Sequence, residues 1–387
     1  MGRKRKTRNS KKSKHSGHPH LPLELIAEIL ARLPAKTLLK LRIVSKEWKS
    51  LIDSPNFTSL HLNLCKSNCE NSSFFLIEEG RSKVPFSSIR CAETFRRTRR
   101  FDMPNYFVDH HDIGGNYVNG VLLVRILSSD GMRVFSFVVW NPSIRKSIEI
   151  NPPGPLLTQH TRVGLGYESE AHDLKVVVMV CEENPWRDCP APNPSRVPFP
   201  VWVHVYSLKA RAWRSSRVQT QWFKSLRFED RPVFFNGAIH WVGCDVGMVP
   251  YPFYGSHVIA FDVKNEVFST FGLPGGRTVH RSRVLAVLGE SLALLDLYPG
   301  YSRIWVMEKY GVGDSWVKQL TIGLEYHEFL HFNKNGEFLI TVKQKGVKMY
   351  DIKSEKIKDL AKSYRDKLVF MDTFVESLLL LTEDNND

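Results

Sequence analysis

The sequence of 387 residues has few cysteines and no long apolar stretch. No run of eighteen apolar residues occurs, so we expect no transmembrane helix and no membrane partner. The N-terminus lacks the hydrophobic core of a secretory signal, which argues against secretion. The cysteines are irregularly spaced, which in a chain of this length indicates reduced thiols instead of a disulfide framework. They are Cys65, Cys69, Cys91, Cys181, Cys189 and Cys244.

Motifs for catalysis and cofactor binding are also scarce. The sequence has no Gly-x-Ser-x-Gly elbow, and Gly164-Leu165-Gly166 lacks the third glycine and the helix that a dinucleotide loop needs. Asp109-His110-His111-Asp112 offers metal-ligand types, but neighbouring residues on a strand point to opposite faces. Cys65 and Cys69 have no second Cys or His pair at zinc-site spacing. We therefore predict no catalytic residue, no metal site and no cofactor.

Positive charge is the main excess in the composition, with a formal net charge of +14. Residues 1–19 form a basic tail, and such a segment cannot offset its ordering entropy, so we expect it to be disordered. The tail suits nuclear import or weak nucleic-acid binding, or it only keeps the chain soluble. Residues 383–387 form a short acidic tail. The basic residues of the first tail are Arg3, Lys4, Arg5, Lys6, Arg8, Lys11, Lys12 and Lys14.

Residues 20–62 have the apolar spacing of three or four short helices. Pro22 suits a first helical turn, and Pro34 ends the apolar stripe that follows it. Ser45 can cap a later helix, and Ser54-Pro55 can begin the last one. A module this small cannot bury all of its apolar side chains alone. We infer that the spare apolar surface binds a partner; the alternative is a helical hairpin that caps the following domain.

The chain after residue 70 consists of short β-branched or aromatic runs separated by turn residues. In residues 201–206, valines alternate with larger residues, as in a strand with two different faces. Asn119-Gly120, Asn236-Gly237 and Asn335-Gly336 are typical of tight hairpins. The irregular repeat predicts a propeller of six or seven blades. We therefore predict a multidomain α+β chain, with a small all-α module before a large all-β, propeller-like domain.

The helical module resembles an F-box. The matching parts are Leu21-Pro22, the block from Glu28 to Pro34 and the block from Val44 to Trp48, where Ser45 replaces the family's frequent cysteine. The resemblance implies docking to the Skp adaptor of a Skp–cullin–F-box ubiquitin ligase and, through it, to cullin. The implied docking residues are Leu21, Pro22, Ile29, Leu33, Pro34, Leu38, Leu41, Val44 and Trp48. Some of them must form the module's own core, and the sequence does not divide the two groups.

Residues 115–382 resemble the F-box-associated domain (type 1, kelch-like) that follows the F-box in a large plant group. Residues 63–114 would form a connector and the first strands. The matches include Val139 to Arg145, Gly166-Tyr167, Val205 to Leu208, Asn236 to Trp241, Ile304 to Met307 and Phe374 to Leu378. The resemblance implies a domain that binds the protein to be ubiquitylated. Trp140, Trp241 and Trp305 within these matches are expected to be core residues.

Two segments rich in proline and aromatic residues, 185–200 and 248–254, are the candidates for target binding. Prolines keep the first segment out of a central strand, so we expect a surface loop. Aromatic anchors on loops are common in binding sites, although both segments could simply pack on their own blades. The candidate residues are Trp186, Arg187, Phe199, Tyr251, Phe253 and Tyr254.

The basic run Arg96-Arg97-Thr98-Arg99-Arg100 is either a patch for an acidic or phosphorylated target or a solvated loop. Together the features predict a non-catalytic adaptor, located in the nucleus, the cytoplasm or both, that brings an unknown target to a ubiquitin ligase. Two alternatives belong to other classes. One is a basic nuclear protein that binds nucleic acid, and the other is a ligand-binding propeller without a ligase role.

Overall fold

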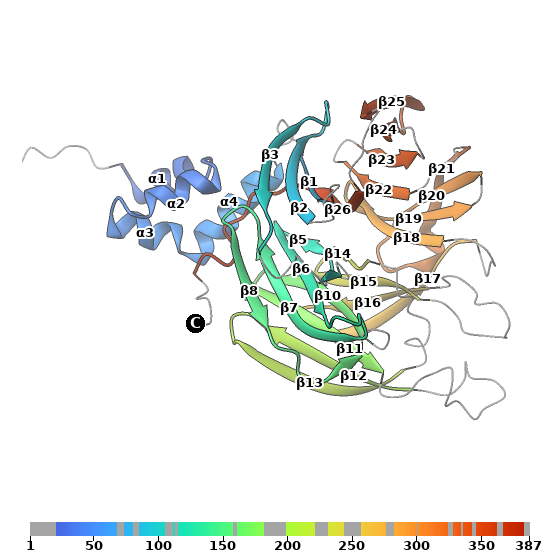
Figure 1. Ribbon diagram of the computed structural model, residues 1–387, viewed down its shortest axis with the longest axis horizontal. Coiled ribbons are helices and arrows are strands. Elements are labelled where there is room, and N and C mark those ends of the chain that lie inside the picture. Colours follow the sequence, from blue (N-terminus) through green and yellow to red (C-terminus); the bar gives the residue numbers. More distant parts are fainter. Residues whose placement is uncertain are drawn as a thin grey trace, which may run out of the picture.

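The computed structural model contains four α-helices and six β-sheets within the residues that it describes (Figure 1). These residues are 21–67, 73–79, 85–104, 111–112, 115–157, 161–181, 199–220, 231–243, 257–275, 282–298, 300–323, 328–333, 336–342, 346–361 and 367–382. The helices lie together on one side of the sheets (Figure 1). No helix in the described part of the chain is long and apolar enough to span a membrane.

The helices follow one another closely. They are α1 (Leu23–Leu30), α2 (Ala35–Leu41), α3 (Lys46–Ile52) and α4 (Pro55–Ser67). A proline directly precedes both α1 and α2. The Ser45 hydroxyl accepts a hydrogen bond from the Trp48 backbone N–H at 3.1 Å, and the Ser54 hydroxyl accepts one from the Phe57 N–H at 3.2 Å. Both serines thus cap helix N-termini, as the sequence predicted.

Each sheet is built mainly from strands that are consecutive in the chain. The first contains β1 (Ser73–Glu79), β2 (Pro85–Cys91), β3 (Arg97–Asp102) and the distant β26 (Lys367–Thr373). The second contains β4 (His111–Asp112), β5 (Tyr117–Val118), β6 (Val121–Leu127), β7 (Arg133–Asn141), β8 (Lys146–Ile150) and β9 (Leu156–Leu157). The third contains β10 (Thr161–Glu168), β11 (Asp173–Cys181), β12 (Phe199–Ser207) and β13 (Ala212–Thr220); the fourth contains β14 (Val233–Phe235), β15 (Ala238–Gly243), β16 (His257–Asp262) and β17 (Val267–Gly272). The fifth contains β18 (Ser282–Leu288), β19 (Ser291–Tyr298), β20 (Tyr301–Met307) and β21 (Trp316–Ile322), with a 3-10 turn, η6 (Gly313–Ser315), before β21. The sixth contains β22 (Glu328–Phe332), β23 (Glu337–Val342), β24 (Gly346–Asp351) and β25 (Lys356–Ala361).

The six sheets are the blades of a β-propeller, which confirms the predicted fold class with six blades in the described residues (Figure 1). The ring is closed by β26, which pairs antiparallel with β1. Phe74 lies opposite Thr373 and Leu76 opposite Met371 in this pairing. The first and last strands of the domain therefore complete one blade, and this pairing closes the ring of blades.

Asn-Gly pairs form hairpin turns at two of the predicted places. Asn119 and Gly120 have φ values of 53° and 85° between β5 and β6, and Asn236 and Gly237 have 47° and 74° between β14 and β15. Both residues of a type I′ turn require positive φ, and asparagine and glycine tolerate it best. In the third pair Asn335 lies outside the described residues, whereas Gly336 has a φ of 82°.

The propeller core consists of apolar side chains between neighbouring blades. One cluster joins residues of β11 and β12 to residues of β15 and β16. Trp140 and Trp241 are 2% and 1% exposed, as expected for core residues. Trp305 is half-buried against a core cluster, and its indole N–H donates to the buried Asp296 carboxylate at 3.2 Å. At Gly164 a Cβ would lie 2.7 Å from Ile239 Cγ2, so this glycine serves blade packing.

A C-terminal segment, residues 374–382, connects the propeller to the helices (Figure 1). Leu378 is 1% exposed and belongs to the core of the helical module. Leu380 is 5% exposed and belongs to a core cluster of the propeller. The same short segment therefore contributes to both hydrophobic cores, and burial of its leucines stabilises the contact between the two parts.

Candidate functional site

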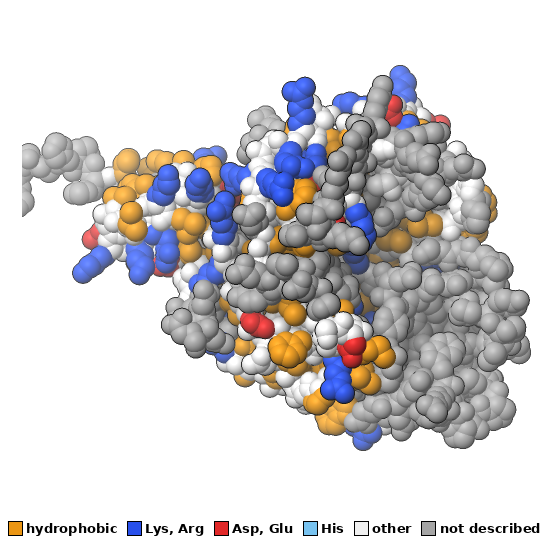
Figure 2. Space-filling model, viewed as in Figure 1, with side chains coloured by type: hydrophobic (Ala, Val, Ile, Leu, Met, Phe, Trp, Pro, Cys, Tyr) orange, Lys and Arg blue, Asp and Glu red, His pale blue; other side chains and the backbone are white. Residues whose placement is uncertain are grey.

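Exposed apolar side chains are concentrated on the helical module. Six of the fourteen large hydrophobic residues that are exposed in the described part of the chain fall within residues 21–44. Figure 2 shows orange side chains on the helices among lysines and arginines. The six are Leu21, Leu23, Leu25, Ile29, Ile43 and Val44. Contiguous exposed apolar surface marks protein-interaction sites, and such a concentration of exposed apolar side chains makes the module the candidate for one.

The structure divides the predicted docking residues into three groups. Leu38 is fully buried in the module's core. The others are exposed or half-buried: Leu21, Pro22, Ile29, Pro34 and Val44 are exposed, and Leu33, Leu41 and Trp48 are half-buried against the same core. Leu38 can thus support a docking surface only by holding the helices together, whereas the exposed group is accessible to a partner.

Three exposed residues escaped the sequence prediction, namely Leu23, Leu25 and Ile43. Ile43 is 87% exposed, the largest value among the exposed hydrophobic side chains of the described chain. A signal was present at the start of the module. Leu25 and Ile29 are one turn apart on α1 and both are exposed, so they form a second apolar stripe beside the one that faces the core, and Leu21 lies just before the helix. Two apolar stripes on one short helix indicate that one packs against the module's own core and the other binds a second protein.

Helix α3 is fixed by local polar contacts next to this surface. The Arg42 guanidinium binds the Asp53 carboxylate through two hydrogen bonds of 2.6 and 2.8 Å. Hydrogen bonding from its own backbone N–H and from Ser45 lowers the pKa of Glu47, so this carboxylate is ionised in the first turn of α3. These contacts hold the loop that contains Ile43 between two ordered elements.

The module is joined to the propeller by hydrogen bonds as well as by leucines. The Glu376 carboxylate accepts a bond of 3.1 Å from the Ala35 N–H at the start of α2. The Asn141 side-chain amide donates to the carbonyls of Ser377 and Leu379 at 3.0 and 2.7 Å. Satisfied buried polar groups make such a joint specific in geometry. We infer that the apolar surface keeps a defined orientation relative to the blades.

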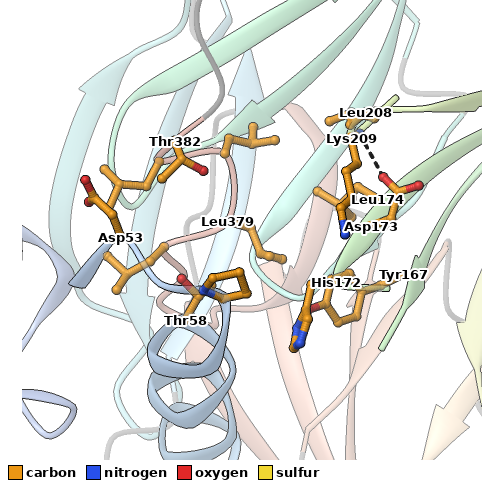
Figure 3. Close-up of a pocket in the computed structure, with 14 residues that line it drawn as sticks. Asp53, Thr58, Tyr167, His172, Asp173, Leu174, Leu208, Lys209, Leu379 and Thr382 are labelled. Carbon is orange, nitrogen blue, oxygen red and sulfur yellow. Dashed lines mark hydrogen bonds between the residues drawn. The ribbon is translucent and has the colours of Figure 1, made fainter. Parts of the chain in front are cut away.

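A cavity of about 240 Å³ lies between α4, the C-terminal segment and the third blade (Figure 3). Asp173 on its wall accepts hydrogen bonds from the Ser207 hydroxyl at 2.6 Å and the Lys209 N–H at 3.0 Å. His172 Nδ1 lies 3.0 Å from the hydroxyl of Ser59 on α4. These polar groups are engaged with the protein itself, so the cavity is part of the joint and we assign no ligand to it.

The predicted target loops fall mostly outside the described residues. Trp186, Arg187, Tyr251, Phe253 and Tyr254 lie there, and their assignment stays a prediction. The sixth candidate, Phe199, is the first residue of β12, where its backbone pairs with Thr220.

The basic run lies largely in a strand. Arg97 to Arg100 belong to β3, the outermost strand of the first blade, which corrects the alternative of a solvated loop. Arg96, Arg97, Arg99 and Arg100 are all exposed, and Figure 2 shows blue side chains over this strand. The guanidinium carbons of Arg97 and Arg100 lie 4.9 and 4.0 Å from the centre of the Phe86 ring. Contact with the ring limits their movement and presents a fixed positive surface.

One metal-binding motif was missed in the sequence. Residues 327–331 are His-Glu-Phe-Leu-His, the spacing of a zinc-protease motif, which places both histidines on one face of a helix. Glu328–Phe332 form strand β22 instead, and His327 lies outside the described residues. The strand therefore does not provide the helical arrangement that the motif requires. His111 and Asp112 form the two-residue strand β4, and Cys69 lies outside the described residues.

These features define a two-module protein of the adaptor type, with an exposed apolar helical module fixed to a six-bladed propeller. The model of the F-box domain matches residues 19–60, and the model of the F-box associated beta propeller domain matches residues 116–373. The second match covers more than half of the chain. The chain therefore belongs to the F-box proteins with an F-box-associated β-propeller domain.

Relatives from Arabidopsis thaliana agree with this assignment. The F-box protein CPR1 is 26% identical over 93% of this chain and 89% of its own length. An F-box/kelch-repeat protein is 22% identical over 79% of this chain and 80% of its own. The F-box/WD-40 repeat-containing protein 1 is 26% identical over 78% of this chain and 68% of its own. The resemblance to a plant F-box protein is thus confirmed.

Proposed function

We propose that this chain is the substrate-recognition subunit of a Skp–cullin–F-box ubiquitin ligase. The helical module binds the Skp-type adaptor, which links it to cullin, and the propeller binds the protein to be ubiquitylated. The family membership supports the class of function. The observation that carries the docking role is the set of six exposed apolar residues on a module whose own core is already formed.

The expected docking surface combines the exposed part of α1 with the loop between α2 and α3. Leu25 and Ile29 supply the first part, and Ile43 and Val44 supply the second. A few central apolar anchors usually provide most of an interface's binding energy. The half-buried Trp48 supports this surface from the module's core.

A receptor of this kind acts by positioning. The conjugating enzyme that arrives with cullin carries the reactive thioester, and the receptor raises the effective concentration of a target lysine beside it. The contacts of Glu376 and Asn141 fix the module against the propeller, which suits a positioning role. A flexible connection would lower the effective concentration of the target lysine at the thioester. No catalytic side chain of the chain itself is needed.

Target binding is assigned to two kinds of surface. The loops with Trp186, Arg187, Tyr251, Phe253 and Tyr254, together with Phe199 at the start of β12, remain our proposal for aromatic contacts. The arginines of β3 suit an acidic or phosphorylated segment of the target, because guanidinium groups bind carboxylates and phosphates through paired hydrogen bonds. We place the complex in the nucleus, the cytoplasm or both.

Capture by a plant Skp-type adaptor tests this function. We expect the intact chain to co-purify with the adaptor, and the double variant Ile29→Asp, Val44→Asp to lose at least tenfold in captured protein. Val267→Asp is the matched control, because Val267 is 56% exposed on the propeller, close to the 55% of Ile29. A folded intact chain that is not captured, or equal capture of the double variant, would contradict the proposal.

A further inference from the structure

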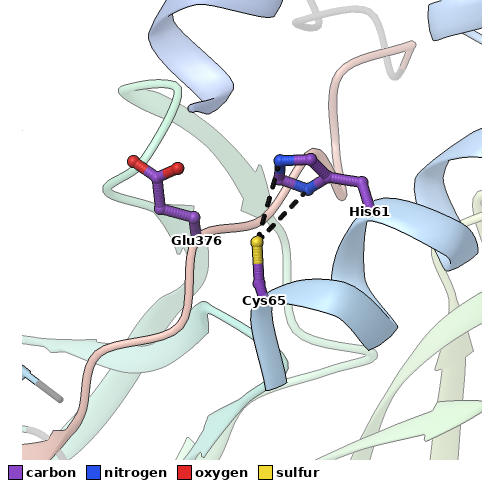
Figure 4. A group of neighbouring side chains, drawn as sticks. All are labelled: His61, Cys65 and Glu376. Carbon is purple, nitrogen blue, oxygen red and sulfur yellow. Dashed lines mark hydrogen bonds between the residues drawn. The ribbon is translucent and has the colours of Figure 1, made fainter. Parts of the chain in front are cut away.

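Three side chains of metal-binding types meet where the helical module contacts the C-terminal segment (Figure 4). His61 and Cys65 are one turn apart on α4, and Glu376 comes from the segment that follows β26. One ligand atom of each residue lies within 4.8 Å of the other two. None of the three takes part in the proposed docking surface.

The surroundings already orient two of these groups. His61 is fully buried, and its Nε2 lies 3.2 Å from the carbonyl of Leu33. A carbonyl can only accept a hydrogen bond, so Nε2 carries the proton and Nδ1 keeps its lone pair. Glu376 is held by the Ala35 N–H through Oε2. Histidine ligands of metals usually donate their second N–H to such a carbonyl, which fixes the ring.

We propose that His61, Cys65 and Glu376 form a binding site for a zinc ion. Zinc accepts nitrogen, sulfur and carboxylate oxygen, whereas magnesium and calcium avoid sulfur. With bond lengths of about 2.1 Å to nitrogen and 2.3 Å to sulfur, two ligand atoms of a tetrahedral site are about 3.5 Å apart. Cys65 Sγ lies 3.8 Å from both His61 Nδ1 and His61 Nε2, so the thiol has to turn toward the Nδ1 side of the ring for both residues to bind one ion.

Binding requires small adjustments within the site. The three ligand atoms, which lie within 4.8 Å of one another, must move to separations of about 3.5 Å to bind one tetrahedral ion. The Cys65 thiol gives its proton to solvent as zinc binds. A water molecule completes four ligands, since the protein supplies three. The bound ion would link α4 directly to the C-terminal segment and so add a bond between the module and the propeller.

The sequence did not suggest this site, because Glu376 lies more than three hundred residues after Cys65. Sequence patterns for zinc depend on ligands at short, regular spacing. Here the third ligand, Glu376, is brought near the other two only when β26 has paired with β1 and the segment after it has packed against the helices. The proposal does not depend on the chain's role in ubiquitylation.

Cobalt substitution tests the site in the full-length chain. Co²⁺ should bind with a thiolate-to-cobalt charge-transfer band, and Zn²⁺ in excess should remove this band and raise the melting temperature. Cys65→Ser should abolish the band and weaken Zn²⁺ binding at least tenfold. Cys91→Ser is the matched control, because Cys91 is also half-buried but lies on β2, away from the cluster.

Glu376→Gln keeps the size of the side chain, so it distinguishes a loss of zinc binding from a loss of folding. We expect this variant to retain the charge-transfer band, since the thiolate remains, but to bind Zn²⁺ more weakly than the intact chain. The proposal is overturned by a folded intact chain that binds no Zn²⁺, by a Co²⁺ spectrum without the thiolate band, or by a band that Cys91→Ser removes and Cys65→Ser leaves unchanged.

Discussion

The helical module and the propeller differ in how completely they bury their apolar residues. In the propeller, all six residues of β15 are buried, and the apolar clusters lie between blades. In the module, Leu38 is completely buried, yet Ile43, five residues later, is 87% exposed. Eight of the fourteen exposed large hydrophobic residues of the described chain are spread over the propeller, whereas six are crowded into residues 21–44 of the much smaller module. This crowding indicates that the module functions with a partner over its apolar face.

The propeller presents a different kind of surface. On β3 the exposed side chains are arginines held against Phe86, not apolar groups. A constant adaptor suits an apolar interface, and a regulated target suits a charged one, whose contacts can be changed by phosphorylation. The chemistry of the two surfaces is therefore consistent with the two partners that we propose.

The largest loss is expected where the propeller is most tightly packed. Trp241→Ala should lower the free energy of unfolding by about 3–5 kcal/mol, because the indole is 1% exposed between blades and leaves a cavity. Chemical denaturation of the full chain measures this loss. A decrease below about 1 kcal/mol would show that the blade interface does not support the domain.

The module offers a matched pair of substitutions. Leu38→Ala should cost about 2–5 kcal/mol of stability. Ile43→Ala should change the stability by about 0.5 kcal/mol or less, and should instead weaken adaptor binding by about 2 kcal/mol. Denaturation and calorimetric titration measure the two quantities. The comparison fails if Ile43→Ala is the more destabilising of the two.

A substitution in the joint between the module and the propeller should cause a loss of stability of intermediate size. Asn141→Ala removes two hydrogen bonds to the C-terminal segment and leaves two buried carbonyls without these donors, at a cost of about 1–3 kcal/mol. Hydrogen exchange should become faster in residues 374–382 and stay unchanged in β15 and β16. Unchanged exchange in the segment would mean that Leu378 and Leu380 alone hold it.

The smallest effect is expected at a helix cap. Ser45→Ala removes the acceptor of the Trp48 N–H and should cost about 1 kcal/mol. Ser45→Asp should restore most of the loss, because aspartate caps equally well. Thermal unfolding of the wild type, Ser45→Ala and Ser45→Asp gives the order of their stabilities. If the alanine variant matches the wild type, the cap does not stabilise α3.

Local chemistry made much of the fold predictable. The serine caps and the Asn-Gly turns each depend on a few neighbouring residues, and the structure has them at positions expected from the sequence. Pairing of β1 with β26 was not predictable in the same way, because it joins residues from opposite ends of the domain. The number of blades depends on how all the strands are grouped into sheets, and the irregular repeat left it open between six and seven.

The candidate site was predictable only in part. The sequence identified the docking module, but it could not tell that Leu38 belongs to the module's core, and it gave no sign that Ile43 is exposed. Four short helices cross at angles that local spacing does not specify, so neither the inner nor the outer face can be assigned without the packing. The grouping of His61, Cys65 and Glu376 required the closed propeller for the same reason.

Hydrogen exchange of the full chain with and without a plant Skp-type adaptor tests the central claim most directly. We predict slower exchange in α1, the loop at Ile43 and Val44 and the start of α3, with the blades unchanged. Protection confined to the propeller, with none in residues 21–48, would contradict the division of roles between the two modules.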